Sequence, residues 1–293
     1  SGVYYPLFVS ATGAAAVQRE FELGGIDRTA NFNLNLKVKS NADVVFLDPA
    51  YTFVSPVFGG QLTLDMTSIV GVNTVALSGT LTSSVGPATV TRSGSIRDSV
   101  SGAGDLYPKA TLRWNAGVNN YMTYVMGDIP IGTYDSSRLA NLGIGHGAID
   151  GGGGYTYLDP ATGHEFSAVT GFTYNFTNTS TDYQNGIDWH LDWGASQFLS
   201  KTAFIGAVGY FYEQITADKG SLPILGPVES GVIGLGPQLG FIIPAGDEKI
   251  YLNFKAYEEF DNHDRPAGWN AWVTLSISVN PPPATRPTVA AKY

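Results

Sequence analysis

The 293-residue chain has no cysteine, few charged residues and no long run of large apolar residues. The absence of cysteine excludes a disulfide framework, structural Cys–Zn sites and thiol catalysis. Charged residues make up 14% of the chain, whereas soluble domains carry ~25%. Two long uncharged stretches, residues 1–18 and 66–91, are not dominated by Leu, Ile and Phe as a membrane-spanning helix would be. We therefore expect no transmembrane helix.

A surplus of basic residues is also missing. The net charge is −9, which argues against a nucleic-acid partner, because phosphates call for a basic surface. The mean hydropathy is close to zero, so the chain resembles neither a helical membrane protein nor a disordered one. This intermediate value suits a barrel with an apolar outside and a polar inside.

The clearest pattern that is present lies in residues 248–279. Apolar and polar residues alternate along 248–260 and again along 269–279, and a period of two indicates β-strands, whose successive side chains point to opposite faces. The two arms are 13 and 11 residues long. Strands of soluble proteins usually have ~5–6 residues, whereas a strand tilted across a bilayer needs ~9–11. Their length therefore predicts membrane-spanning strands.

Segments of similar length follow one another from Gly104 to the end of this hairpin. The connections between them alternate between short turns and longer polar loops. Short turns on one side and long loops on the other are typical of an outer-membrane barrel, whose long loops lie outside the cell. The predicted strands are 104–115, 119–131, 145–157, 164–177, 186–199, 202–216, 229–243, 248–260 and 268–279.

The N-terminal third is less regular. Residues 3–11, 29–54 and 61–82 read as three further strands, which gives twelve in all; dividing 29–54 into two would give thirteen, against the even number of bacterial barrels. With twelve strands, the second and third extend above the membrane, and the long loops are 12–28 and 83–103. In residues 61–82 the apolar set changes from even to odd positions, which predicts a β-bulge near Asn73.

The predicted fold class is therefore an all-β, twelve-stranded antiparallel transmembrane β-barrel of the bacterial outer membrane. Residues 1–279 form the single barrel domain, and 280–293 form a Pro-rich periplasmic tail. Aromatic residues gather near the predicted ends of the apolar faces, as in the aromatic girdles of membrane barrels. We place Tyr174, Phe176, Tyr212 and Trp269 toward the outer interface and Trp114 and Tyr121 toward the periplasmic one.

Four stretches resemble the outer-membrane channel family named for the meta-pathway of phenol degradation. They are FVSPVFGGQLTLD at 53–65, DYQNGIDWHLDWG at 182–194, GAVGYFYEQIT at 206–216 and GPQLGFIIP at 236–244. The resemblance implies a twelve-stranded barrel in the outer membrane of a Gram-negative bacterium. It also implies the inward passage of small, often hydrophobic or aromatic, molecules for catabolism. It carries no catalytic or binding residue over to this chain.

The polar faces of the predicted strands supply the candidate pore lining. Their charges are mixed, so no ring of a single sign selects ions, and several aromatic side chains share the same face. Such a lining suits small neutral or amphipathic solutes, or else the groups pair across a narrow barrel and seal it. The candidates are Asp105, Tyr107, Lys109, Arg113, Glu165, Asp188, His190, Asp192, Lys249, Tyr251, Asn253, Lys255, Tyr257 and Glu259.

Two features invite a more specific chemistry. Asp188, His190 and Asp192 share one strand face, and could hold a divalent metal or form a hydrogen-bond network with Lys or Arg on other strands. The glycines at 151–154 lack the Lys-Ser/Thr of a P-loop, and we interpret them as positions in a strand where missing side chains thin the wall, widen the lumen or permit a sharp bend. A gap there would let a hydrophobic solute leave sideways into the membrane.

The sequence thus predicts a passive, monomeric diffusion channel that is not an enzyme and needs no cofactor. Its partners are outer-membrane lipids and small-molecule solutes. One alternative is a barrel enzyme that hydrolyses lipids or peptides, although the chain has only 4 histidines and no G-x-S-x-G elbow. Another is a sealed structural or adhesive barrel. A soluble β-sandwich is the weakest alternative, because it explains neither strand length nor loop alternation.

Overall fold

The computed structural model describes residues 2–11, 30–85, 88–220, 229–246, 248–265 and 267–278. No helix with the length and hydrophobicity needed to cross a membrane occurs in these ranges. The regular elements are all strands: β1 Gly2–Ala11, β2 Ala30–Leu47, β3 Ala50–Thr52, β4 Gln61–Val85, β5 Ala88–Ala116, β6 Asn119–Asp128, β7 Ala148–Asp159, β8 His164–Asn175, β9 Tyr183–Gln184, β10 Asp188–Phe198, β11 Ala203–Gln214, β12 Lys219–Gly220, β13 Gly231–Ala245, β14 Glu248–His263 and β15 Trp269–Ser278.

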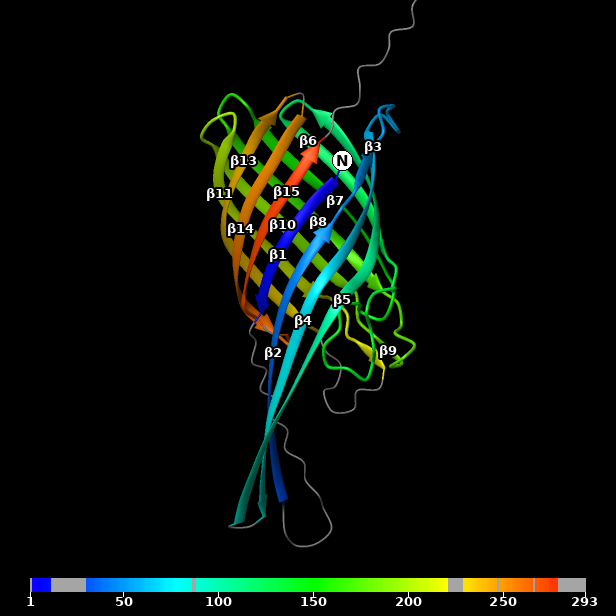
Figure 1. The fold of residues 1–293 in the computed structure, drawn as a ribbon, viewed down its shortest axis with the longest axis vertical. Helices are drawn as coiled ribbons and strands as arrows, with labels where there is room; N and C mark the ends of the chain where they lie inside the picture. The colour runs from blue at the N-terminus through cyan, green and yellow to red at the C-terminus, as the bar shows by residue number, and fades with distance from the viewer. Residues whose placement is uncertain are drawn as a thin grey trace, which may run out of the picture.

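The long strands form one closed antiparallel sheet. β1 pairs with β2 on one side and with β15 on the other, and β2 pairs with β4, so the sheet closes on itself. Within the described residues the ring is β1-β2-β4-β5-β6-β7-β8-β10-β11-β13-β14-β15, which is twelve strands. The result is a tilted-strand barrel (Figure 1). The prediction of an all-β antiparallel barrel is confirmed.

The connections differ between the two ends of the barrel. At one end β5 and β6 are joined through Gly117 and Val118, and β7–β8, β10–β11 and β13–β14 have similarly short turns. At the other end the longer connections 129–147 and 176–187 follow β6 and β8. The sorting of these loops agrees with the sequence. The predicted loop 12–28 and the tail 280–293 lie outside the described residues.

Two predictions in the N-terminal third are wrong. Residues 83–103 are not a loop, because β4 runs to Val85 and β5 starts at Ala88. Residues 29–54 are not one strand either: β2 ends at Leu47, and the three-residue β3 pairs with β4 beside the ring. Residues 83–103 instead continue strands that are 25 and 29 residues long, and Asp48 and Pro49 separate β2 from β3.

The bulge predicted near Asn73 is absent. β4 pairs with β2 without interruption from Ser68 to Val85, and the ladder with β5 shifts register between Ser68 and Val70 instead. Val72 is 40% exposed on the outer face, whereas Val75 is buried on the inner face. The apolar residues of β4 change from even to odd positions because the inner face of the sheet becomes a packed core around Val75. The strand itself stays regular.

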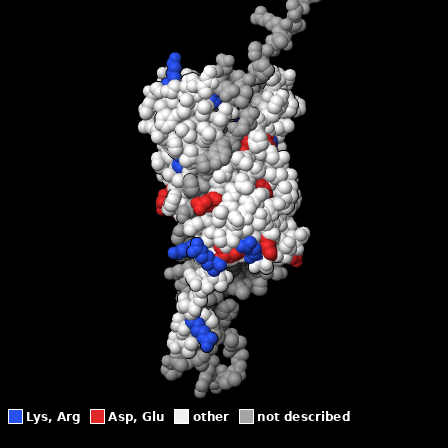
Figure 2. Space-filling model, in the orientation of Figure 1, with Lys and Arg blue, Asp and Glu red and all other residues white. Residues whose placement is uncertain are grey.

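The outer wall of the barrel is apolar. Large hydrophobic side chains alternate outward along the strands and are exposed, such as Phe172 at 54%, Val125 at 54% and Phe254 at 41%. Figure 2 shows that charged side chains are few on this face of the wall. They gather near the end of the barrel from which the long strands β2, β4 and β5 project. A contiguous exposed surface of this kind is suited to lipid rather than water.

Aromatic residues lie on this wall much as predicted. Tyr121, Tyr174, Phe176 and Trp269 are all exposed. Tyr212 is the exception, since its hydroxyl donates to Asp188 Oδ1 (2.7 Å) on the inner face. The sequence placed it wrongly because β11 is apolar on both faces and does not reveal its orientation.

β2, β4 and β5 continue past the long-loop end of the barrel as a narrow three-stranded sheet, which we call the extension (Figure 1). Its base is covered on the inner face by the loop 129–147. Ala140 of this loop is fully buried against Val75 and Val100. The loop therefore lies against the inner wall at the mouth of the barrel.

Two carboxylates hold this loop. Asp105 accepts hydrogen bonds from Gly132 N and Ile144 N, both 2.7 Å, and is 1% exposed. Asp98 accepts from Arg138 Nη2 (2.7 Å) and from Ala140 N (3.1 Å). The hydrogen bond from Arg138 keeps the pKa of the Asp98 carboxyl well below its usual range. Charge-assisted bonds of this kind are about twice as strong as neutral ones.

We expect Asp98→Asn to release the loop, because the amide loses the charge that binds the guanidinium. Trypsin cleavage after Arg138 in the folded protein should accelerate about tenfold. Asp43→Asn, at an exposed carboxylate of β2, is the matched control and should leave the rate unchanged. Equal cleavage rates in both variants would contradict the assignment.

The same ion pair predicts a pH dependence. A carboxyl whose pKa is lowered by folding stabilises the folded state fully above its ordinary pKa of ~3.9, and this contribution is lost as the pH falls through the lowered value. Hydrogen exchange of residues 133–143, corrected for intrinsic rates, should therefore be constant from pH 8 to 5 and rise only below about pH 4. A rise between pH 7 and 5 would disprove it.

Candidate functional site: the barrel lumen

The register of the strands decides which side chains face the lumen. On β10 the side chains that face the lumen are Asp188, His190 and Asp192. Each is aligned with residues of the neighbouring strands that face the lumen as well. His190, for example, is aligned with Gly171 on β8 and with Tyr212 on β11. The same rule brings together polar and aromatic residues that are far apart in the chain.

Four cavities occupy the lumen and its short-turn mouth. The aromatic cavity, about 840 Å³, is lined by Tyr107, Tyr210, Tyr212, Tyr257 and Trp272, with charged groups among them. A second cavity of about 430 Å³ lies toward the short turns, and a third of about 390 Å³ lies against β6–β10. The mouth cavity, about 850 Å³, lies behind the turn after β3.

Most of the predicted lining residues border these spaces. Tyr107, Lys109 and Glu259 border the aromatic cavity, Glu165 and Tyr251 the second, and Arg113 and His190 the third. Asp192, Lys255 and Tyr257 border both the aromatic and the second cavity. Four candidates border none of the four: Asp105, Asp188, Lys249 and Asn253. Of these, Asp105 and Asn253 are buried, at 1% and 0% exposure, under other groups.

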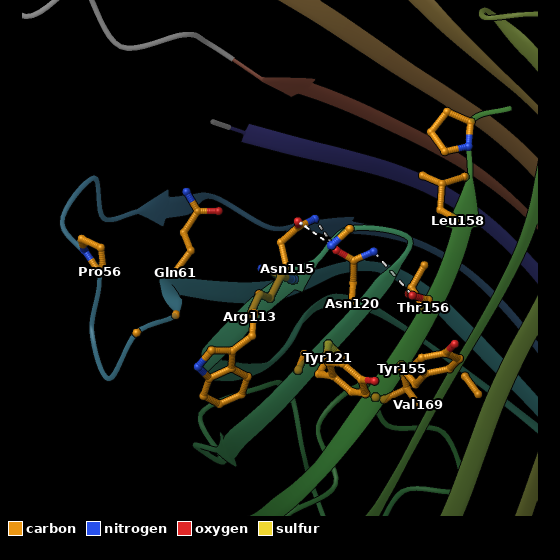
Figure 3. Close-up of a pocket in the computed structure, with 18 of the residues that line it drawn as sticks. Pro56, Gln61, Arg113, Asn115, Asn120, Tyr121, Tyr155, Thr156, Leu158 and Val169 are labelled. Carbon is orange, nitrogen blue, oxygen red and sulfur yellow. Dashed lines mark hydrogen bonds between the residues drawn. The ribbon is translucent and has the colours of Figure 1, made fainter.

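Neighbouring cavities share some of their lining residues. Asp192, Lys255 and Tyr257 form a waist between the aromatic cavity and the second one. The second cavity meets the mouth cavity at Thr156 and Leu158. Figure 3 shows the mouth cavity, where Asn115 Nδ2 donates to Asn120 Oδ1 (2.5 Å) and the amide of Asn120 points to Thr156. The aromatic cavity, the second cavity and the mouth cavity therefore adjoin one another in this order.

Polar groups in the lumen are bound to uncharged partners more often than to Lys or Arg. His190 Nε2 lies 3.1 Å from Asp150 Oδ2 and 3.2 Å from the Tyr124 hydroxyl. Asp188 accepts from Tyr212 and from Asn175 Nδ2 (2.8 Å). The predicted network exists, and the hydrogen bonds of Asp188 and His190 run to Tyr, Asn and Asp side chains rather than to Lys or Arg.

The metal alternative finds no added support. No group of three or more His, Cys, Asp or Glu side chains with the geometry of an ion site occurs in the described ranges. His190 instead contacts Asp192 Oδ2 at 3.6 Å in addition to Asp150. This arrangement can hold the imidazole in place and keeps carboxylates facing the lumen.

The glycines at 151–154 have a different role from the predicted gap. β7 pairs residue by residue with β6 and β8 along the whole run, so the ladder has no break. A Cβ on Gly152 would lie 2.1 Å from Thr170 O, and one on Gly171 would lie 2.2 Å from the Tyr124 hydroxyl. The two inward glycines leave the space through which Tyr124 reaches across β7 and β8 to His190.

Sequence reasoning missed several of these residues, namely Tyr124, Asp150, Tyr210 and Tyr212. They lie on strands whose alternation is weak, because glycine and aromatic residues occupy both faces. A signal that could have found them is the match of an aromatic residue with a glycine on a neighbouring strand. The pairs Tyr210–Gly234 and Phe204–Gly240 repeat it, with the ring lying where a Cβ would be.

Comparison with known families decides the identity. The family model described as "Putative MetA-pathway of phenol degradation" matches residues 21–275. The chain belongs to this family. No curated protein matches it significantly.

Among solved structures, the COG4313 outer membrane channel from Pseudomonas putida F1 is similar to this chain. The TM-score is 0.64 at 13% identity, over 94% of this chain and 92% of that one. A FadL homologue from Pseudomonas aeruginosa aligns with a TM-score of 0.40 at 10% identity, over 94% and 88% of the two chains. The first match supports the fold of an outer-membrane β-barrel, in agreement with the apolar outer wall.

The glycine that receives Tyr124 can be tested directly. We expect Gly171→Ala to lower the free energy of unfolding by about 1–3 kcal/mol, because the added methyl group forces the Tyr124 ring and the neighbouring backbone apart. The measurement is urea unfolding in lipid vesicles. Gly151→Ala, on the outer face of the same sheet with no atom closer than 3.7 Å, should stay within ~0.5 kcal/mol of the parent. Similar losses in both variants would refute this role.

Proposed function

We propose that the protein is a passive diffusion channel in the outer membrane of a Gram-negative bacterium, through which small hydrophobic or aromatic molecules enter. The observation that carries this proposal is the series of adjoining cavities lined by aromatic rings. Tyr210 and Tyr257 lie 5.0 Å apart between ring centroids, and Phe46 and Trp272 lie 5.8 Å apart, at the aromatic cavity. Family membership supports the same function.

The lining acts in two ways in this proposal. Solvated groups such as Asp192, whose side chain is 64% exposed, keep a wet path open. The aromatic rings give weak and reversible contacts, each contributing ~0.5–1.5 kcal/mol. We propose that the path is lined by Tyr107, Lys109, Arg113, Glu165, His190, Asp192, Tyr251, Lys255, Tyr257 and Glu259, together with Trp272, which the alternation of residues 269–279 also predicts to face inward, and with Tyr210 and Tyr212, which are added to the predicted set.

A single chain suffices for this function, because the ring closes within one copy and the cavities lie inside it. No energy coupling, cofactor or catalysis is part of the proposal. A sealed structural barrel and a barrel hydrolase are the competing functions. The adjoining cavities favour a channel over a sealed barrel. The hydrogen bond of His190 to Asp150 and the channel fold of the structural relative favour a channel over a hydrolase.

The test uses solutes that bilayers exclude and that differ by one ring. We expect proteoliposomes to admit phenyl glucoside faster than methyl glucoside in a swelling assay, because the ring binds the lumenal aromatics. Tyr257→Ala with Trp272→Ala should reduce the phenyl-to-methyl ratio about 3- to 10-fold. Lys249→Ala, which borders none of the four cavities, is the control and should keep the parental ratio.

The competing outcomes are distinct. If the double variant kept the parental ratio, the aromatic lining would play no part in selection. If neither glucoside caused swelling with the parent protein, and conductance in planar bilayers stayed at baseline, the sealed barrel would be correct and the channel proposal wrong.

A further inference from the structure

The two faces of the extension differ in chemistry. Its inner face carries apolar side chains, including Val38, Val75 and Leu77, and is packed at the base. Its outer face, on the even positions of β4, is polar and rich in hydroxyl groups. Thr74 is paired with Ser99 and Thr80 with Ser93, with hydroxyl oxygens 2.9 and 3.0 Å apart.

Two cations stand on this outer face in a single row. Lys39 of β2 is aligned with Ala76 of β4, and Ala76 is aligned with Arg97 of β5. Both charged residues are exposed, and the small alanine separates them. Two steps of ~4.8 Å across the ladder place their Cα atoms about 10 Å apart. Flexible side chains at that spacing can meet one multiply charged anion from two sides.

The row lies just outside the lipid-facing wall. Val70 and Val72 are both 40% exposed on the outer face of β4, in the apolar band. Ala76 follows Val72 by four residues, or about 13 Å along a strand at ~3.3 Å per residue. Because the strands are tilted (Figure 1), the height gained is smaller. The two cations are therefore at the level of lipid headgroups and of the sugars attached to them, and in Figure 2 charged side chains gather at this boundary.

Neither cation has a carboxylate partner among the residues that the structure describes. The ion pairs of the described residues include neither Lys39 nor Arg97. Asp98 is next to Arg97 in sequence but faces the opposite side of the sheet, where Arg138 binds it. Asp43 is also on the outer face of β2, but it is four residues from Lys39 along the strand and is aligned with Val72, nearer the membrane. In a chain of net charge −9, two cations on one hydroxyl-rich surface, unpaired within the described ranges, favour an anionic partner.

We propose that Lys39, Arg97 and the hydroxyl groups around them bind the phosphorylated saccharide headgroup of the outer-leaflet glycolipid. Phosphate is held by the two cations, and the sugar hydroxyls are hydrogen-bonded by the Ser and Thr side chains. Basic residues near an anionic lipid surface contribute to such binding in proportion to their number. The bound glycolipid fixes the extension relative to the membrane plane. This inference does not depend on what the lumen transports.

The experiment measures binding of a rough lipopolysaccharide with intact core phosphates to the full chain in detergent, by fluorescence anisotropy of the labelled glycolipid. We expect Lys39→Ala with Arg97→Ala to weaken binding about 30-fold. Raising the salt concentration should weaken binding to the parent protein but have less effect on the variant. The same lipopolysaccharide, dephosphorylated, should bind the parent protein as weakly as the variant binds the phosphorylated form.

The matched control removes the same charge elsewhere. Arg92 is exposed on the other face of the extension, and Lys201 is exposed in a short turn at the opposite end of the barrel. Arg92→Ala with Lys201→Ala should bind like the parent. The conservative pair Lys39→Arg with Arg97→Lys should retain most of the affinity, and the heat-modifiable gel shift reports whether each variant is folded. If the alanine pair fails to fold, Lys39→Gln with Arg97→Gln replaces it.

Three results would overturn the proposal. The first is equal binding by the parent and by the folded Lys39/Arg97 variants. The second is an equal loss in the control pair, which would reduce the effect to net charge. The third is undiminished binding of the dephosphorylated glycolipid.

Discussion

Closure of the sheet is the constraint on which the rest of this structure depends. Within the hydrocarbon of a membrane no water is present to satisfy backbone N–H and C=O groups, so a β-structure can span it only as a ring without edges. The pairing of β1 with both β2 and β15 meets this requirement. Once the ring is closed, alternate side chains must face lipid or lumen, and the two surfaces acquire opposite chemistry.

The lumen of this barrel is filled by long aromatic side chains that need room to cross it. Inward glycines provide that room: Gly171 receives Tyr124, Gly234 receives Tyr210 and Gly240 receives Phe204. The rings carry hydroxyl groups to carboxylates on other strands, as Tyr210 does to Glu259 at 2.6 Å. These carboxylates are thereby hydrogen-bonded without a Lys or Arg partner, and cavities remain between the clusters. Glycine opposite tyrosine thus gives the rings room and leaves the cavities that the proposed diffusion channel would use.

Outside the membrane band the same three strands serve another purpose. In the extension, β2, β4 and β5 contact neither lipid nor the lumen. Their outer face, which is apolar along the barrel, carries hydroxyl groups and two cations there. Their inner face becomes the support for the loop 129–147, which Asp98 and Asp105 hold against the mouth of the barrel. Position relative to the membrane, rather than a break in the strands, accounts for this change of composition.

The sequence by itself determined the fold class and the facing of the regular strands. The strict alternation of residues 248–279 and the sorting of loop lengths were enough, because both follow from local geometry. It also placed Lys255, Tyr257 and Glu259 on the inner face, where the structure has them beside the aromatic cavity. It failed where strands are apolar on both faces, as at Tyr212, and where strands outlast the membrane, as at 83–103. Only the tertiary structure decided that Tyr124 reaches His190, that Asp105 is covered by a loop, and that Lys39 and Arg97 share a row. Each depends on the register between strands distant in the chain, which the hydrophobic patterns of both strands and the geometry of the turns fix together rather than any single segment alone.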